Sequence, residues 1–468
     1  MLSQPVTLSP AAIALNRFGL GARPDEAVPA DPVRWLTDQF ARFDPRPAGF
    51  ASLGDAGAIV ERYRNQQLDT RRLAGQADPA DAKARQTALR KDFQQDVQAL
   101  YRAGVQARTD SALATQAPFI ERMVHFWSNH FCISADNPRV AVFAGAFERD
   151  AIRPHVLGTF SDMLLAAEQH PAMLIYLNQA QSIGPNSPAA ARNPDRKRGL
   201  NENLAREIME LHTLGVRSGY SQADVTEFAR ALTGWTIDSP GAGADIGNPD
   251  QFAFRPARHE PGERTILGQR YAQDGQAQAR AALIEFARSP ATAHHIATKL
   301  ARHFAGDDPP PAMVSRLAES FSRSKGDLPT VYRALIASPE AWVAHAVKFK
   351  TPWEWTISSL RGLGQVRVGA LPIAAVQAQL GQRVWKPGSP AGWDDIAASW
   401  TGPDALMRRV EIAQRLAASV GAVADARVLA TQILPGALGA ATADQIARSE
   451  SPAGAIALML VSPDFLRR

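Results

Sequence analysis

The stretch NENLAREIMELHTLG, residues 201–215, has the spacing of an amphipathic helix and carries an acid on its apolar side. At about 100° per residue, its apolar side chains fall within an arc of roughly 120°. They are Leu204, Ile208, Leu211 and Leu214. Glu207 lies inside this arc. Asn203, Glu207 and Glu210 follow one another at i, i+4 and i+7, so we expect one polar stripe along the edge of the helix.

This stripe has two interpretations. Helices present acids in this way to a metal, a substrate or a buried cation. In the alternative, Glu207 pairs with an arginine of a neighbouring helix as a structural brace, because ion pairs perturb carboxylates as readily as active sites do. In either case we expect Glu207 to be largely buried and hydrogen-bonded to a residue outside its own helix.

Helical spacing recurs along most of the chain. Ser9 is expected to cap a helix that begins at Pro10, and Asp31 with Pro32 repeats this arrangement. Residues 55–116 are charged and rich in Ala and Gln, with one break, which indicates two long helices that form a hairpin. These patterns predict an all-α protein.

One β element interrupts the helices. Two short alternating runs, Phe252–Arg255 and Thr265–Leu267, are separated by a link rich in Pro and Gly, as in a small hairpin. The expected fold is therefore a multi-helix globular protein with one small β-hairpin near 252–271.

The order of these patterns divides the chain into four expected regions. They are an N-terminal helical region with the long hairpin (1–116), a central helical core with the polar stripes (117–237), a loop and β-hairpin insertion (238–271) and a C-terminal helical region (272–468). Gly and Pro cluster without periodicity at 179–199 and 238–251, so we expect mobile loops there.

Composition limits the classes of function. A chain of 468 residues that is 45% hydrophobic can bury a large core. The 51 basic residues barely exceed the 46 acidic ones and the arginines are scattered, so nucleic-acid binding is not expected. The single cysteine, Cys132, excludes an internal disulfide and a cysteine-cluster metal site, and c-type haem is not expected because CxxCH is absent.

Motifs and targeting signals are few. GxSxG, P-loop and GxGxxG patterns are absent, which disfavours serine hydrolases, nucleotide hydrolases and Rossmann dehydrogenases. The sequence has no stretch of 18 apolar residues that would predict a transmembrane segment. Its start lacks the basic and apolar regions of a cleavable signal, so a cytoplasmic location is expected.

A second polar stripe is expected on the helix APFIERMVHFWSNHF, residues 117–131. Glu121, His125 and Asn129 lie on one side of this helix, opposite a wide apolar face. The alternative is a solvated helix face. If this stripe met the one in residues 201–215, carboxylates and imidazole would form a cluster that binds a divalent metal or carries out acid–base chemistry.

This convergence defines the expected site. The expected catalytic residues are Glu207, Glu210, His125, Asn203, Asn129 and His259, and the expected metal ligands are His125, Glu207 and Glu210. His259 lies in a polar loop framed by Gly and acids, from which it could reach a site built by helices, although an exposed turn residue is the alternative. The leading hypothesis is a metal-dependent or acid–base enzyme of unknown reaction.

Two further segments have structural interpretations. One helix carries Lys299 and Arg302 together with three histidines, which indicates a positive surface. The histidines are His294, His295 and His303. In KPGSPAGWDDIAASW, Asp394 or Asp395 is expected to cap the following helix.

Three other segments, together with residues 201–215, carry a resemblance to a known family. They are RFGLGARPDE (17–26), ERMVHFWSNHF (121–131) and KFKTPWEWTISSLRGLG (348–364). Nearly end to end, the chain resembles the bacterial domain of unknown function 1800 family. The resemblance implies a helical protein, often encoded beside an exported sulfatase-like protein. It therefore implies an alternative role, as a non-catalytic partner or maturation factor that is co-exported with that protein.

Overall fold

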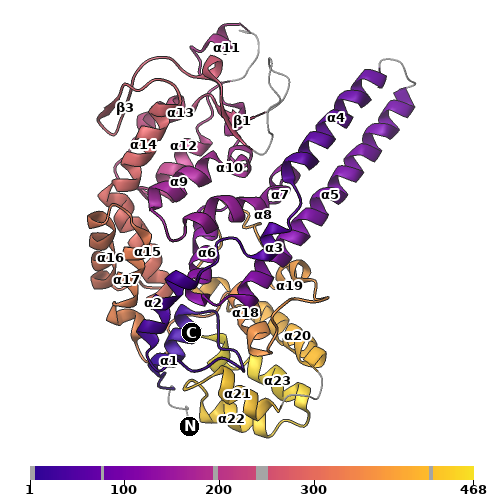
Figure 1. Cartoon of the computed structure of the whole chain (residues 1–468), viewed down its shortest axis with the longest axis vertical. Coiled ribbons are helices and arrows are strands. Elements are labelled where there is room, and N and C mark those ends of the chain that lie inside the picture. The colour runs from indigo at the N-terminus through magenta and orange to yellow at the C-terminus, as the bar shows by residue number, and fades with distance from the viewer. Residues whose placement is uncertain (1–5, 75–78, 193–198, 239–250, 421–424) are drawn as a thin grey trace.

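The computed structural model describes residues 6–74, 79–192, 199–238, 251–420 and 425–468. Helices of many lengths account for most of these residues (Figure 1), so the expected all-α class is confirmed. None of the helices within these ranges is long and apolar enough to cross a membrane. Parts of the two expected mobile loops, 193–198 and 239–250, lie outside the described residues.

The N-terminal elements begin where the capping residues predict. Ser9 accepts a hydrogen bond from the Ala12 backbone, and Asp31 accepts one from Arg34. The elements are α1 (Pro10–Ile13), the π-turn η1 (Ala14–Phe18), α2 (Pro32–Arg42), α3 (Ala48–Ala51), α4 (Ala56–Ala74) and α5 (Pro79–Ala114).

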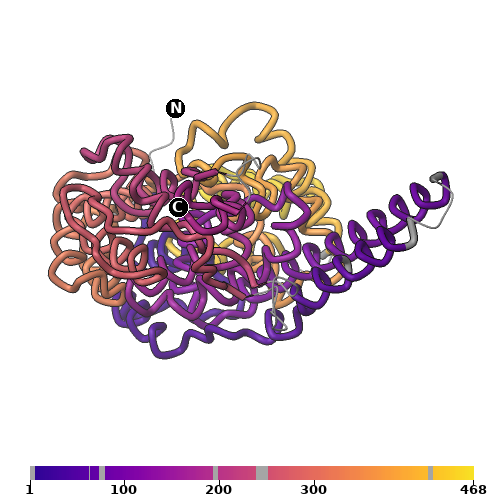
Figure 2. The backbone as a smooth tube through the Cα atoms, turned by 90° about the horizontal axis from the view of Figure 1, so that it is seen from above, coloured from indigo at the N-terminus to yellow at the C-terminus, as the bar shows by residue number. Residues whose placement is uncertain are grey.

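Helices α4 and α5 form the long hairpin that the sequence predicts. Figures 1 and 2 show it extending well away from the rest of the molecule. Its exposed polar part is held together by contacts such as the ion pair between Arg62 and Asp96. The second half of α5 returns to the body, where Val97, Tyr101 and Val105 are buried.

The central region surrounds α6 (Pro118–His130). The other helical elements here are α7 (Pro138–Ala141), α8 (Ala144–Phe147), η2 (Glu148–Ile152), η3 (Arg153–His155), α9 (Phe160–Gln169), α10 (Pro171–Tyr176), η4 (Gln179–Gln181), α11 (Pro188–Ala191), α12 (Asn203–Glu207), η5 (Ile208–His212) and α13 (Gln222–Leu232). Two of them, η2 and η5, are π-turns, whose hydrogen bonds run from i to i+5.

The β structure lies where it is expected, but its strands pair differently. The run at β2 (Phe252–Phe254) pairs with β1 (Trp235–Ile237), just after α13, rather than with the second expected run. That second run, β3 (Arg264–Ile266), forms a tight hairpin with β4 (Gln269–Tyr271). A short 3-10 turn, η6 (Pro256–Arg258), separates β2 from β3.

In the described part of the C-terminal region, the elements from α14 onward are helices joined by loops. Its elements are α14 (Gln276–Arg288), α15 (Pro290–Ala305), α16 (Pro311–Arg323), α17 (Leu328–Ile336), η7 (Pro339–Trp342), α18 (Pro352–Gly362), α19 (Ile373–Gln379), η8 (Ala397–Ser399), α20 (Pro403–Val420), α21 (Ala426–Ile433), α22 (Ala440–Ala447), α23 (Pro452–Leu460) and α24 (Pro463–Leu466).

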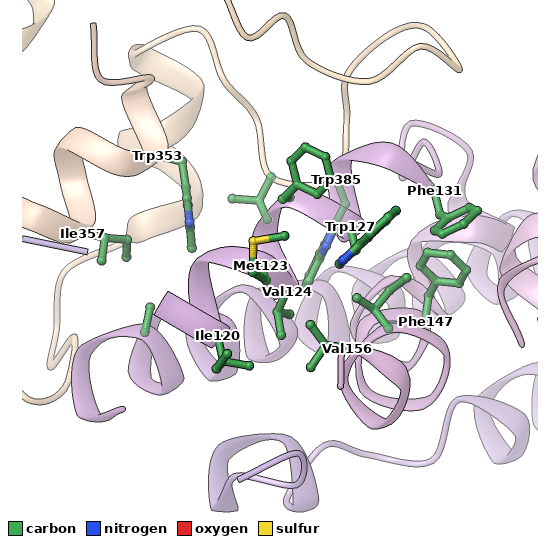
Figure 3. Close-up of a cluster of buried hydrophobic side chains, with 14 of the residues drawn as sticks. Ile120, Met123, Val124, Trp127, Phe131, Phe147, Val156, Trp353, Ile357 and Trp385 are labelled. Carbon is green, nitrogen blue, oxygen red and sulfur yellow. The ribbon is translucent and has the colours of Figure 1, made fainter. Parts of the chain in front are cut away.

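Helix α6 lies at the centre of the hydrophobic core. Figure 3 shows its apolar residues beside Trp353 and Trp385, which come from segments far along the chain. The polar stripe of α6 is not solvated, because Glu121 is buried and pairs with Arg153, and His125 and Asn129 are half-buried. The neighbouring Ser128 donates a hydrogen bond of 3.0 Å to a buried glutamate of η2. The solvated-face alternative is therefore wrong.

Candidate functional site

A cavity of about 430 Å³ lies where α6, α15, the start of α18 and the 382–396 segment meet. Its polar lining consists of Arg108, Arg122, His125, Ser128, Asn129, Lys299, Arg302, His303, Thr351, Glu354, Gln382, Asp394 and Asp395. Its apolar lining includes Phe126, Trp353, Trp385 and Trp393. A volume of this size suits a small-molecule ligand.

The start of α18 forms one wall. Thr351 and Glu354 make a reciprocal capping box, in which each side chain accepts a hydrogen bond from the backbone of the other residue. Glu354 also pairs with Arg122 and, at 2.7 Å, with Arg468. Burial acts to raise the pKa of Glu354, but these two guanidiniums outweigh burial and hold it well below the usual value.

The clearest chemical pair in the cavity is His303 and Asp395. The His303 Nδ1 lies 2.7 Å from Asp395 Oδ2. Lys348 fixes the other side of Asp395, since its Nζ lies 3.1 Å from Oδ1. Burial acts to raise the pKa of Asp395, but His303 and Lys348 lower it to about 2, so this carboxylate stays ionised.

The neighbours of His303 define its tautomer. An ionised Asp395 can only accept, so Nδ1 carries the proton and donates it. Nε2 is then the acceptor nitrogen, and it accepts a hydrogen bond of 3.5 Å from the Arg122 guanidinium. Burial, partly offset by Asp395, lowers the pKa of His303, which keeps the imidazole neutral at neutral pH. A neutral imidazole oriented by a carboxylate is the arrangement of a general base.

Lys299 lies one turn before His303 on α15. Its Nζ lies 2.9 Å from His130 Nδ1, and the His130 Nε2 donates to the His212 carbonyl at 3.1 Å. Burial lowers the pKa of Lys299 to about 8. Cys132 lies close by, and burial raises the pKa of its thiol to about 12, so it remains protonated.

His125 and Asn129 are the two expected site residues that line this cavity. The His125 Nδ1 accepts a hydrogen bond of 3.1 Å from the Trp353 indole, and its Nε2 is turned toward Glu121 at 3.7 Å. Burial lowers the pKa of His125 well below its usual value. His125 therefore holds the Trp353 ring in place.

Asn129 holds the loop that closes the cavity. Its side chain forms two hydrogen bonds with the Trp393 backbone, at 2.8 and 2.9 Å. Gly392 has a φ of +82°, and a Cβ there would lie 2.4 Å from the Asn129 carbonyl oxygen. Only glycine allows the loop to approach α6 this closely.

The acidic stripe of residues 201–215 lies outside the cavity. Asn203 is exposed, and Glu210 accepts a long hydrogen bond of 3.5 Å from Tyr220. Glu207 is half-buried, and burial raises its pKa. Within the described residues its carboxylate makes no hydrogen bond or ion pair, so the expectation that it pairs outside its helix is wrong.

The two stripes do not form the expected cluster. Helices α6 and η5 meet through the hydrogen bond from His130 to the His212 carbonyl, five residues beyond His125. Among the described residues, no group of three or more His, Cys, Asp or Glu side chains is arranged to hold a metal ion. The set of His125, Glu207 and Glu210 therefore does not converge as expected.

His259 is also separate from the cavity. Its Nδ1 lies 2.9 Å from the Thr233 carbonyl, and its ring packs on Phe254. The adjacent Glu260 is buried and accepts a hydrogen bond of 2.8 Å from the Asn186 backbone. These contacts tie the segment before β3 to the loop after η4.

Two structural interpretations from the sequence need correction. The segment with Lys299, Arg302 and His303 is not simply a positive surface, because all three side chains line the cavity. Asp395 caps no helix and instead pairs with His303 and Lys348. Asp394 accepts a hydrogen bond from Ser399 at 2.9 Å.

Comparison with known proteins identifies the family to which the chain belongs. Neither the curated proteins nor the solved structures contain a match to it. A family model described as "Protein of unknown function (DUF1800)" matches residues 13–467. The chain therefore belongs to the DUF1800 family.

Proposed function

We propose that this protein is an enzyme that carries out acid–base chemistry in the cavity, with His303 as the general base. The observation that carries the proposal is the 2.7 Å contact between His303 Nδ1 and Asp395. The Nε2 lone pair faces the cavity, where it accepts a long hydrogen bond of 3.5 Å from another lining side chain, Arg122, which a substrate proton would replace. Asp395 fixes the tautomer and stabilises the imidazolium that forms when His303 accepts a proton.

Of the two chemistries expected from the sequence, acid–base catalysis has the more specific support. Three elements far apart in the chain supply the parts: α15 provides His303, the 386–396 segment provides Asp395, and Lys348 precedes α18. Holding three charged or polar groups in partial burial costs free energy, and enzymes accept that cost at their active sites.

The test replaces His303 or Asp395 by asparagine, a polar side chain that cannot act as the base or carry the charge. Purified protein would be incubated with a metabolite extract, and depletion of each compound would be followed by mass spectrometry. We expect H303N and D395N to slow depletion by about 10²–10⁴-fold, the usual contribution of general acid–base catalysis. The control is H294N, on the exposed side of the same helix.

Two results would contradict the proposal. One is an H303N variant that is folded, as judged by circular dichroism and thermal unfolding, and depletes the same compounds at the wild-type rate. The other is a wild-type protein that changes no compound in the extract.

A second candidate function, binding a partner protein, is favoured by the α4–α5 hairpin. It extends away from the body, and its two helices hold ten basic and six acidic residues. We propose the exported sulfatase-like protein suggested by the family resemblance as its partner. This function would be supported if the sulfatase-like protein co-purified with the full chain but not with a chain whose hairpin is shortened. Equal recovery of the sulfatase-like protein with the full and the shortened chain would contradict it.

A further inference from the structure

We infer that the cavity binds an organic anion whose carboxylate, phosphate or sulfate group contacts Lys299 and Arg302, with its apolar body held by the aromatic walls. This inference names the substrate class of the proposed enzyme and so rests on that function. It also makes a separate claim about binding that can be tested without turnover.

Lys299 and Arg302 have no acidic partner in the part of the chain that the structure describes. The Lys299 ammonium lies 2.9 Å from His130, and the Arg302 Nε donates to the Asp307 carbonyl at 3.3 Å. Within the described residues, neither forms an ion pair with a carboxylate. The other cations of the cavity do: Arg108 pairs with Glu148 and Arg122 pairs with Glu354.

The charges of Lys299 and Arg302 also lie close together. Lys299 and Arg302 are three residues apart on α15, which places them on neighbouring positions of one helix face. Their mutual repulsion costs free energy in a partly buried cavity, where charges are poorly screened. An anion that bridges them removes this cost and supplies the missing partner for each.

The apolar walls of the cavity indicate the rest of the ligand. Phe126, Trp353, Trp385 and Trp393 line the same cavity. The Trp353 indole is fixed by His125 at 3.1 Å, and the Arg108 guanidinium lies 4.8 Å from its centroid. Rigid aromatic surfaces bind flat or apolar groups with little loss of side-chain entropy. The ligand is therefore an anion with an apolar body rather than a bare inorganic ion.

The position of the base adds a constraint on the substrate. His303 follows Lys299 by one helical turn, and side chains at i and i+4 have Cβ atoms roughly 5–6 Å apart. An anion held by Lys299 therefore places the atoms a few bonds away from it beside His303. We infer that the proton removed by His303 lies within a few bonds of the anionic group.

The experiment compares three ligands of one shape and different charge: benzoate, benzamide and benzamidine. Binding is measured by isothermal titration calorimetry on the full chain. We expect benzoate to bind at least tenfold more tightly than benzamide, and benzamidine not to bind. K299M and R302M are each expected to weaken benzoate binding by about tenfold or more, the usual value of a hydrogen bond to a charged group, and to leave benzamide binding unchanged.

R288M, which changes an exposed cation at the end of α14, is the matched control and should bind benzoate normally. The use of two variants guards against misfolding, since Lys299 contacts His130 whereas Arg302 does not. Equal affinity for benzoate and benzamide, absence of benzoate binding, or normal benzoate binding by both variants would overturn the inference.

The outcomes also separate this inference from the proposed function. H303N is expected to keep its affinity for benzoate, because His303 supplies the base and not the anion site. If H303N binds benzoate but turns over at the wild-type rate, the proposed function fails while the anion site stands. If benzoate binding does not depend on Lys299 and Arg302 while H303N is inactive, the inferred anion site is wrong and the proposed function stands.

Discussion

His303 shows how far the chemistry of single residues follows from the sequence. On a helical wheel of α15, it lies about 20° from Ile296 and about 60° from Leu300, inside the buried arc. His303 is therefore, like Glu207, a polar side chain inside an apolar arc. Its partner Asp395 could not be predicted, because 92 residues separate the two and only the folded chain brings them together.

Glu207 remains informative because it is half-buried and, among the residues that the structure describes, has no hydrogen-bond or ion-pair partner. Burial raises its pKa above the usual 4.5, so the folded chain binds this proton more tightly than the unfolded chain. The free energy of unfolding of the wild type should therefore fall as the pH rises from about 4.5 through the raised pKa.

The variant E207Q should lack this decrease. We expect it to match the wild type at pH 4 and to be more stable at pH 8, as measured by urea unfolding across this range. E285Q, on an exposed position of α14, serves as control and should behave as the wild type does. A lower stability of E207Q than wild type at pH 8 would show that Glu207 is a brace after all.

At the scale of elements, helix starts are well predicted and π-turns are not. Ser9 and Asp31 cap their helices as expected, because a capping side chain and the proline after it act locally. The π-turn at Ile208–His212 has no such local signal. A π-turn has more residues per turn than an α-helix, so the spacing of about 100° per residue no longer holds after Glu207. For this reason the positions expected for Glu210 and Leu211 on the helix are incorrect.

The loop that closes the cavity provides a test at this scale. Gly392 and Gly388 both have positive φ, but only a Cβ at Gly392 would meet another group, the Asn129 carbonyl. G388A should cost about 1–2 kcal/mol from the left-handed backbone alone. G392A should cost more and should also weaken benzoate binding, because the loop must leave α6.

Hydrogen exchange of the 386–396 amides and calorimetry would measure both effects. Similar exchange rates and similar benzoate affinities in G388A and G392A would show that the contact between Gly392 and Asn129 does not hold the cavity wall.

At the scale of the molecule, the cavity depends on contacts between the central and C-terminal segments. Helical periodicity identifies α6 and α15 separately, but it does not say which faces meet, since that depends on long-range packing. For this reason the sequence predicts two polar stripes that converge, whereas the structure brings the α6 stripe to α15 and α18.

The outer part of the α4–α5 hairpin lies away from the contacts that form the cavity, and this leads to a last prediction. The body holds α5 through its second half, where Tyr101 donates a hydrogen bond of 2.8 Å to the Val384 carbonyl. Replacing residues 65–92 with a short Gly-Asn turn keeps the pair between Arg62 and Asp96 at the new tip. We expect the shortened chain to fold, with a Tm within a few degrees of the wild type and unchanged benzoate affinity, because local contacts at a projecting end add little to the core. Thermal unfolding and calorimetry measure both quantities, and a shortened chain that folds but no longer binds benzoate would show that the hairpin shapes the cavity.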